Sequence, residues 1–114
     1  IVGPEAITGS TRMKAGTATK LILNMLTTTT MIKIGKVYEN LMVDLRATNV
    51  KLTDRAERII MTVTGVSQDN AKKLLESAFG NAKVAIVMQK LGIDYTEAKK
   101  RLDVQGGFVR KVLE

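Results

Sequence analysis

The stretch MKAGTATKLILNMLTTTTMIKIG, from Met13 to Gly35, decides how this chain folds, because it predicts one long helix. Most of its apolar residues recur three and four positions apart, which places them on one helical face. Leu23 and Ile34 add apolar surface elsewhere on the cylinder, and a helix of that kind is normally buried on more than one side. The rest of the chain offers little to cover both sides. We therefore expect a further part of the protein, or a partner subunit, to pack there.

The composition excludes several kinds of chemistry. The 114 residues include no cysteine and no histidine. Thiolate nucleophiles, disulfides, Cys/His zinc sites and Ser-His-Asp triads are therefore absent from this chain. Acid–base chemistry would fall to aspartate, glutamate, lysine or tyrosine. No metal site is expected.

The net charge of +7 favours anionic partners such as phosphate esters. Because the basic residues are spread along the chain, a charge that only keeps the protein soluble is an equal alternative. Aromatic residues make up 4% of the chain, too few for a platform that stacks nucleic-acid bases. The apolar clusters are too short and too polar to span a bilayer. We expect a soluble, cytoplasmic protein that binds neither nucleic acid nor membrane.

After Gly35 the segment KVYENLMVDLRATN, Lys36 to Asn49, has apolar residues at helical spacing. It predicts a second helix, or a continuation of the first after a kink at Gly35. The character of the sequence then changes near Arg46 to Lys51. We therefore divide the chain into residues 1–48 and residues 49–114.

The second part contains repeated helix start and stop signals, which predict several short helices in a compact bundle. Asp54, followed by Glu57 three residues later, predicts the first helix start through a capping box. Further starts are predicted at Ser67, Asn81 and Asp94, and stops at Gly65, Gly80, Gly92 and Gly106-Gly107.

The polar chemistry concentrates in ITGSTRMKAGTATK, Ile7 to Lys20, at the start of the long helix. Ser10 and Thr11 offer hydroxyl groups and unpaired backbone N–H groups, which favour anions at a helix start. Arg12 adds a fork suited to phosphate oxygens, and Lys14 adds positive charge. The pattern predicts a phosphate or sugar-phosphate cradle, although the spacing is not that of a Walker A loop. The alternative is that Ser10 or Thr11 only caps the helix and that the basic side chains are solvated.

Glu5 is the one acidic residue near this loop. Three roles are open to it: acid–base chemistry, binding of a ligand hydroxyl, or an ion pair with Arg12. The ion pair is favoured on charge alone.

Two segments carry a family resemblance. GPEAITGSTRMKAGTATK, Gly3 to Lys20, closely resembles the signature of the N-acetylmuramic acid 6-phosphate etherase and glucokinase regulatory protein family. GKVYENLMVDLRATNVKL, Gly35 to Leu52, looks like the segment that follows this signature in the bacterial etherases. The resemblance covers essentially the whole chain and favours the etherase branch.

The resemblance implies a fold that is mainly α-helical in this chain. Residues 1–48 would be the last loop and helix of an α/β sugar-isomerase (SIS) domain. Residues 49–114 would be a small helical bundle resembling a ubiquitin-associated domain. The chain would then be the C-terminal part of a longer protein. The family resemblance also implies a homodimer with sites near the subunit interface.

The resemblance further implies a carbon–oxygen lyase of cell-wall sugar recycling. Such an enzyme cleaves the lactyl ether of N-acetylmuramic acid 6-phosphate to N-acetylglucosamine 6-phosphate and D-lactate, without a cofactor. The family's acid–base carboxylates lie upstream, so no catalytic residue is assigned here and the chain alone is expected to be inactive. Ser10, Thr11 and Arg12 are the expected contacts to the phosphorylated amino sugar, with Glu5 and Lys14 as secondary candidates. The alternatives are a regulatory protein that binds phosphosugars and a helical protein-interaction module.

Overall fold

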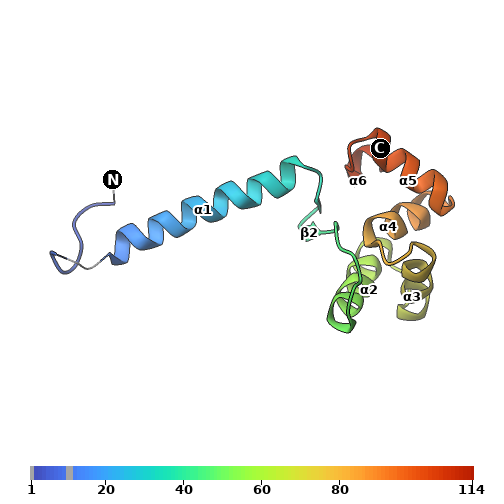
Figure 1. Ribbon diagram of the computed structural model, residues 1–114, viewed down its shortest axis with the longest axis horizontal. Coiled ribbons are helices and arrows are strands. Elements are labelled where there is room, and N and C mark those ends of the chain that lie inside the picture. Colours follow the sequence, from blue (N-terminus) through green and yellow to red (C-terminus); the bar gives the residue numbers. More distant parts are fainter. Residues whose placement is uncertain (1, 10–11) are drawn as a thin grey trace. The chain divides into compact units, whose positions relative to one another are not determined.

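The computed structural model describes residues 2–9 and 12–114, which form two compact units that divide between Lys33 and Ile34. The first unit is a loop followed by helix α1, and the second is a small hairpin followed by five helices (Figure 1). The predicted mainly helical fold is confirmed for the described part of the chain. The elements are α1 (Met13–Lys33), β1 (Val37–Tyr38), β2 (Leu41–Met42), α2 (Val50–Thr64), α3 (Gln68–Ser77), α4 (Ala82–Leu91), α5 (Tyr95–Val104) and α6 (Val109–Leu113).

Helix α1 begins at Met13, as predicted, and continues without a break through the four threonines Thr27–Thr30. The hydroxyl groups of Thr27 and Thr30 donate to the carbonyl oxygens of Leu23 and Leu26 at 3.1 and 2.8 Å. Threonine has a low helix propensity, and these bonds give its hydroxyl groups acceptors within the helix itself. None of the residues of α1 is buried within the described chain.

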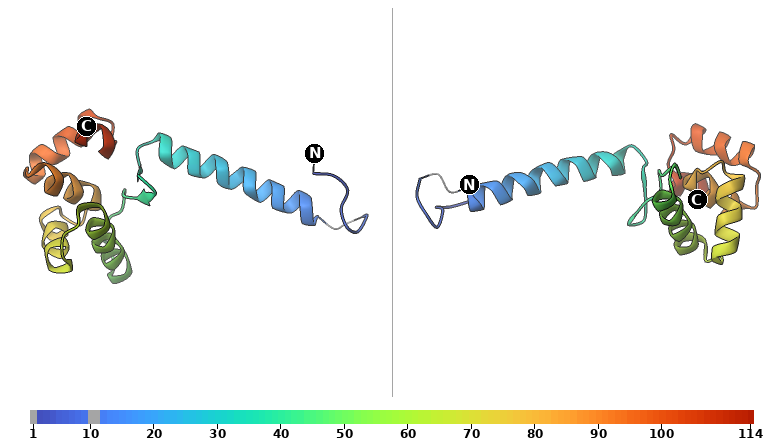
Figure 2. Two further views of the ribbon diagram at one scale, coloured as in Figure 1. Left: turned by 180° about the vertical axis from the view of Figure 1, so that it is seen from behind. Right: turned by 60° about the horizontal axis from the view of Figure 1, so that its bottom comes forward.

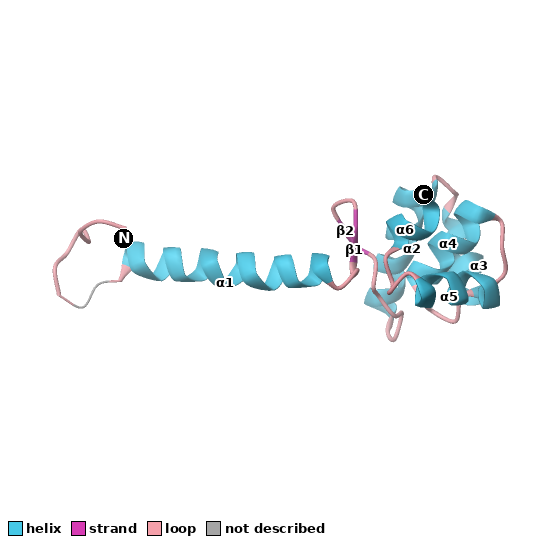
Figure 3. Cartoon of the chain, turned by 90° about the horizontal axis from the view of Figure 1, so that it is seen from above, coloured by secondary structure: helices cyan, strands magenta, loops and turns pink. Residues whose placement is uncertain are grey.

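The segment after Gly35 is a β-hairpin, so the prediction of a second helix there is wrong. Figure 3 draws strands β1 and β2 in magenta. They pair antiparallel, with Val37 opposite Met42 and Tyr38 opposite Leu41. Glu39, in the two-residue turn, has a φ of 51°. A short apolar run fits helical spacing and strand alternation equally well.

The first helix of the bundle begins before the predicted start at Asp54. Asn49 is the N-cap of α2, and its side-chain oxygen accepts a hydrogen bond from the Leu52 N–H at 2.9 Å. Asp54 lies inside α2 and pairs with Arg58 one turn later at 3.1 Å. The capping-box pattern is present at Asp54, but α2 begins five residues earlier, where the side chain of Asn49 caps the helix.

Most of the remaining helix boundaries are where the sequence predicts them. Gly65 and Gly92 end α2 and α4 in the left-handed conformation. Ser67, Asn81 and Asp94 cap α3, α4 and α5, each accepting a backbone N–H three residues later. Helix α3 ends at Ser77, slightly before Gly80.

Helix α4 is the centre of the bundle and contacts α2, α3, α5 and α6. Figure 2 shows this packing from two further sides. Six consecutive residues of α4, from Ala82 to Val87, are buried. Ile60 of α2, Ile86 of α4 and Val109 of α6 are fully buried in this core. Burial of each large aliphatic side chain contributes about 1.5–3 kcal/mol, so α4 organises the core of this unit.

The residues just after α1 pack with the bundle. Val43 is fully buried in its core, and the Ala47 N–H donates to the Gly80 carbonyl at 2.9 Å. The compact units therefore divide earlier than the predicted boundary between residues 48 and 49. The assignment of residues 1–48 to a sugar-isomerase domain stays a prediction.

Among the helices that the structure describes, none combines the length and the apolar character needed to cross a bilayer.

Candidate functional site

The loop before α1 folds back onto the start of the helix through Glu5. One carboxylate oxygen, Oε1, accepts hydrogen bonds from the backbone N–H groups of Lys14 and Ala15, both at 3.0 Å. The other oxygen, Oε2, accepts from the Lys14 N–H at 3.1 Å. A carboxylate is favoured at this end of a helix because the first N–H groups have no partner within the helix. Glu5 is therefore a capping residue.

The cap also determines the charge state of Glu5. The hydrogen bonds from the N–H groups of Ala15 and Lys14, in that order, stabilise the ionised form and lower the pKa of Glu5. The contacts described for Glu5 are with the backbone, so the favoured ion pair with Arg12 is not what holds this carboxylate. An external anion at the N–H groups of Lys14 and Ala15 would have to displace it.

Lys14 is directed toward the loop. Its ammonium group donates to the carbonyl oxygen of Pro4 at 2.8 Å, while its backbone N–H bonds Glu5. This double contact ties the loop to the first turn of α1. Lys14 thus has a clear structural role, and its secondary assignment as a sugar-phosphate contact stays a prediction.

Arg12 lies on a different face of the helix start, together with Lys20. Both line a hollow of about 430 Å³ that runs along α1. Thr19 and Asn24 add polar groups, Gly16 adds no side chain, and no acidic residue among those that the structure describes lines the hollow. The structure thus brings Arg12 and Lys20 together and separates Lys14 from them. This face is suited to an anion held by side chains.

Ser10 and Thr11, the two hydroxyl residues of the predicted cradle, lie outside the described residues. Their roles as sugar-phosphate contacts, or as helix caps, stay predictions.

A second hollow of about 540 Å³ also lies along α1, and its lining is mainly apolar. Val2, Met13, Ala18 and Leu21 contribute to it. Elsewhere on α1 the side chains of Ile22, Leu23, Met25 and Leu26 are each more than half exposed. The prediction of a helix that is apolar on more than one side is confirmed.

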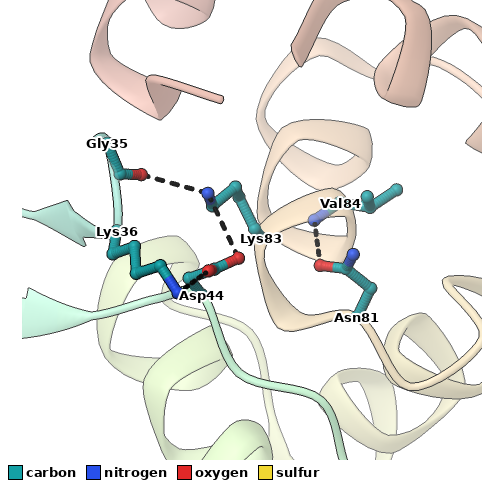
Figure 4. A network of polar contacts seen from close by, with 6 residues as sticks. All are labelled: Gly35, Lys36, Asp44, Asn81, Lys83 and Val84. Atoms are coloured by element: carbon teal, nitrogen blue, oxygen red, sulfur yellow. Dashed lines mark hydrogen bonds and ion pairs between the residues drawn. The ribbon is translucent and has the colours of Figure 1, made fainter. Parts of the chain in front are cut away.

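The second unit contains a polar network that the sequence did not reveal (Figure 4). The ammonium group of Lys83, on α4, donates to the Gly35 carbonyl at 3.0 Å and lies 3.3 Å from the Asp44 carboxylate. Lys36 approaches the other oxygen of Asp44 at 3.2 Å. The only hint in the sequence is a lysine inside the apolar run AKVAIVM, Ala82 to Met88.

Two ammonium groups, those of Lys36 and Lys83, surround the single carboxylate of this network. Partial burial, the largest single effect, raises the pKa of Asp44, but the charge of Lys83 and the hydrogen bonds from Lys36 and Lys83 together outweigh it. The pKa of Asp44 is therefore below its usual value. Lys83 is nine-tenths buried and fully engaged, so the network joins the hairpin segment to α4.

Known proteins similar to this chain include one family of lid domains and several etherases. The family described as the C-terminal lid domain of glucokinase regulatory protein matches residues 39–84. An N-acetylmuramic acid 6-phosphate etherase from Vibrio cholerae is 54% identical over all 114 residues, and one from Alkaliphilus metalliredigens is also 54% identical over the same length. An etherase from a Geobacillus species is 57% identical over 112 residues.

The chain is similar along its whole length to N-acetylmuramic acid 6-phosphate etherases. The resemblance read from Gly3–Lys20 and Gly35–Leu52 is thus confirmed. The chain spans 37–38% of the length of these etherases. The loop, α1 and the bundle are therefore the counterpart of one part of an etherase.

Proposed function

We propose that this chain is the C-terminal part of an N-acetylmuramic acid 6-phosphate etherase. The complete enzyme would cleave the lactyl ether of its substrate to N-acetylglucosamine 6-phosphate and D-lactate. The observation that carries this proposal is the 54% identity to etherases over the whole chain. The match of residues 39–84 to a C-terminal lid domain supports the position within the longer protein.

Within that enzyme, this chain would supply one wall of the phosphosugar site. Arg12 is the leading candidate, because it lies beside Lys20 in a hollow where the described part of the chain places no acidic side chain. Ser10 and Thr11 complete the proposed contacts, with Glu5 and Lys14 as secondary contacts. The acid–base carboxylates would lie in the remaining part of the enzyme.

The exposed apolar faces of α1 support a further part of the proposal. In the complete enzyme they would pack against the rest of a sugar-isomerase domain and against a second subunit of a cytoplasmic homodimer. Apolar helix surface of this extent is normally covered by protein.

The test is a substitution in the full-length enzyme that contains this chain. Arg12→Ala should raise the KM for N-acetylmuramic acid 6-phosphate about 10- to 100-fold, since a hydrogen bond to a charged group contributes about 1.5–3 kcal/mol. Arg55→Ala, which removes an exposed arginine of α2, is the matched control and should leave KM unchanged. Equal KM values for the wild type and Arg12→Ala would refute the role of Arg12.

A regulatory protein that binds phosphosugars is the second candidate, because the matched lid domain is described from glucokinase regulatory protein. The same assay separates the two. A full-length protein that binds the phosphosugar but releases no lactate would favour the regulator.

A further inference from the structure

A groove between α5 and α6 gathers cationic side chains far along the sequence from the loop described above. Its volume is about 280 Å³. One wall is a single face of α5, formed by residues three and four positions apart, and the other wall is α6. It is lined by Glu97, Lys100, Arg101, Val104, Gln105, Lys111 and Val112.

The groove has an excess of positive charge. Lys100, Arg101 and Lys111 face a single carboxylate, that of Glu97. Within the described residues, Lys100 and Lys111 form no ion pair, so their charges are uncompensated by the protein itself. A concave surface with this balance attracts anions.

Two of the three cations are held in position by neighbouring groups. The Glu97 carboxylate accepts from Arg101 Nε at 2.7 Å, which leaves the terminal nitrogens of the guanidinium free to donate elsewhere. The Lys111 ammonium lies 4.6 Å from the centre of the Phe108 ring. Because these contacts already restrict both side chains, the two side chains lose less conformational entropy when a ligand binds.

The rest of the lining shows what else such a ligand would meet. The Gln105 amide can donate or accept a hydrogen bond. Val104 is 74% exposed and provides an apolar surface beside the charges. The groove therefore suits a doubly charged oxyanion attached to a small body with an apolar face.

A second groove in the same unit provides a natural comparison. It has a volume of about 330 Å³ and is lined by Asp69, Lys72, Lys73 and Glu76 of α3. Its two lysines are balanced by two carboxylates. Unlike the α5–α6 groove, it therefore has no excess of positive charge.

We propose that the α5–α6 groove binds a phosphate group, either free or as a monoester. Lys100, Arg101 and Lys111 would donate to its oxygens. Arg101 would use the terminal nitrogens that Glu97 leaves free. This inference concerns the Ile34–Glu114 unit alone and does not depend on the etherase assignment.

The test is an NMR titration of the 114-residue chain with inorganic phosphate at pH 7.5, at constant ionic strength. Saturable shifts at the amides of α5 and α6 are expected. Lys100→Gln combined with Lys111→Gln should weaken this binding at least tenfold. Lys72→Gln combined with Lys73→Gln removes the same charge from the balanced groove and should leave binding unchanged. Circular dichroism of both variants checks that they are folded.

Parallel titrations distinguish the two sources of phosphate. Tighter binding of glucose 6-phosphate than of inorganic phosphate assigns the groove to monoesters, and the reverse order assigns it to free phosphate. Shifts that grow linearly with phosphate, or an equal loss of binding in the two double variants, would overturn the proposal. Either result would mean that the chain responds only to its overall charge.

Discussion

The carboxylate of Glu5 occupies the place that an external anion takes at many helix starts. Its two oxygens accept hydrogen bonds from the N–H groups of Lys14 and Ala15. The chain itself therefore caps the start of α1. The sequence indicated that this helix start favours negative charge. It did not reveal that a residue nine positions upstream supplies that charge.

Glu5→Ala should expose the first amides of α1. We expect hydrogen exchange at Lys14 and Ala15 to become several-fold faster, because both donors lose their partner. Glu76→Ala, at an exposed glutamate of α3, is the control. Unchanged exchange in Glu5→Ala would show that the cap is not formed in solution.

The same cap should depend on pH. The pKa of Glu5 is lowered from 4.5 in the folded chain. The stabilisation is therefore present above pH 4.5 and is lost as the pH falls through the lower, folded pKa. The amide shifts of Lys14 and Ala15 should titrate with a midpoint below 4.5. A midpoint at or above 4.5 would contradict the cap.

Gly35 shows how one residue is constrained by both conformation and space. Its φ is 71°, and a Cβ there would lie 3.1 Å from the Phe108 ring and 3.2 Å from the Gly107 backbone. Its carbonyl oxygen also accepts a hydrogen bond from the Lys83 ammonium group. No side chain fits this position without movement of its neighbours.

Gly35→Ala should lower the free energy of unfolding by about 2–4 kcal/mol, from the left-handed conformation and the overpacking together. Gly65→Ala is the matched control, since Gly65 has a φ of 76° but open space around it. It should cost about 1–2 kcal/mol. Urea unfolding of both variants measures the difference, and equal losses would remove the steric part of the argument.

At the scale of elements, α1 and α4 are both rich in apolar residues but have opposite surroundings. Six consecutive residues of α4 are buried among four other helices. None of the described residues of α1 is buried. The apolar pattern predicts that both helices need to be covered, and only the structure shows which one is covered by this chain.

The exposed faces of α1 predict self-association of the chain. Sedimentation should show a mass that rises with concentration, since burial of these side chains is favourable. Leu26→Glu should shift the midpoint of association by about tenfold or more, because a buried leucine contributes about 1.5–3 kcal/mol. Val50→Glu changes an even more exposed apolar residue, on α2 (88% against 61% for Leu26), and should have no effect. A monomer at all concentrations would contradict this prediction.

At the scale of the whole molecule, the chain has a proposed ligand surface on α1 without a catalytic acid or base assigned beside it. Glu5 is engaged as a cap, and within residues 2–9 and 12–114 no acidic side chain lines the hollow beside Arg12. The 114-residue chain alone should therefore release no D-lactate from N-acetylmuramic acid 6-phosphate. An enzymatic lactate assay measures this, with the full-length enzyme as positive control, and lactate release by the chain alone would refute the prediction.

Much of the architecture could be predicted because it depends on local signals. The start of α1, the caps at Ser67, Asn81 and Asp94, and the stops at Gly65 and Gly92 follow from the chemistry of neighbouring backbone groups. The hairpin at Val37–Met42 could not be predicted in this way. Its strands are so short that their pairing and the burial of Val43 decide between strand and helix.

The amino-acid sequence by itself determined the helical character of the chain, most helix boundaries, the missing cover of α1 and the family resemblance. Each of these depends on residue types at close spacing. Only the tertiary structure decided which groups meet across long separations. Lys83 meets Gly35 and Asp44, and Lys111 joins Lys100 and Arg101 in one groove. The physical reason is that charge pairing and burial act through space, between residues that the sequence alone does not bring together.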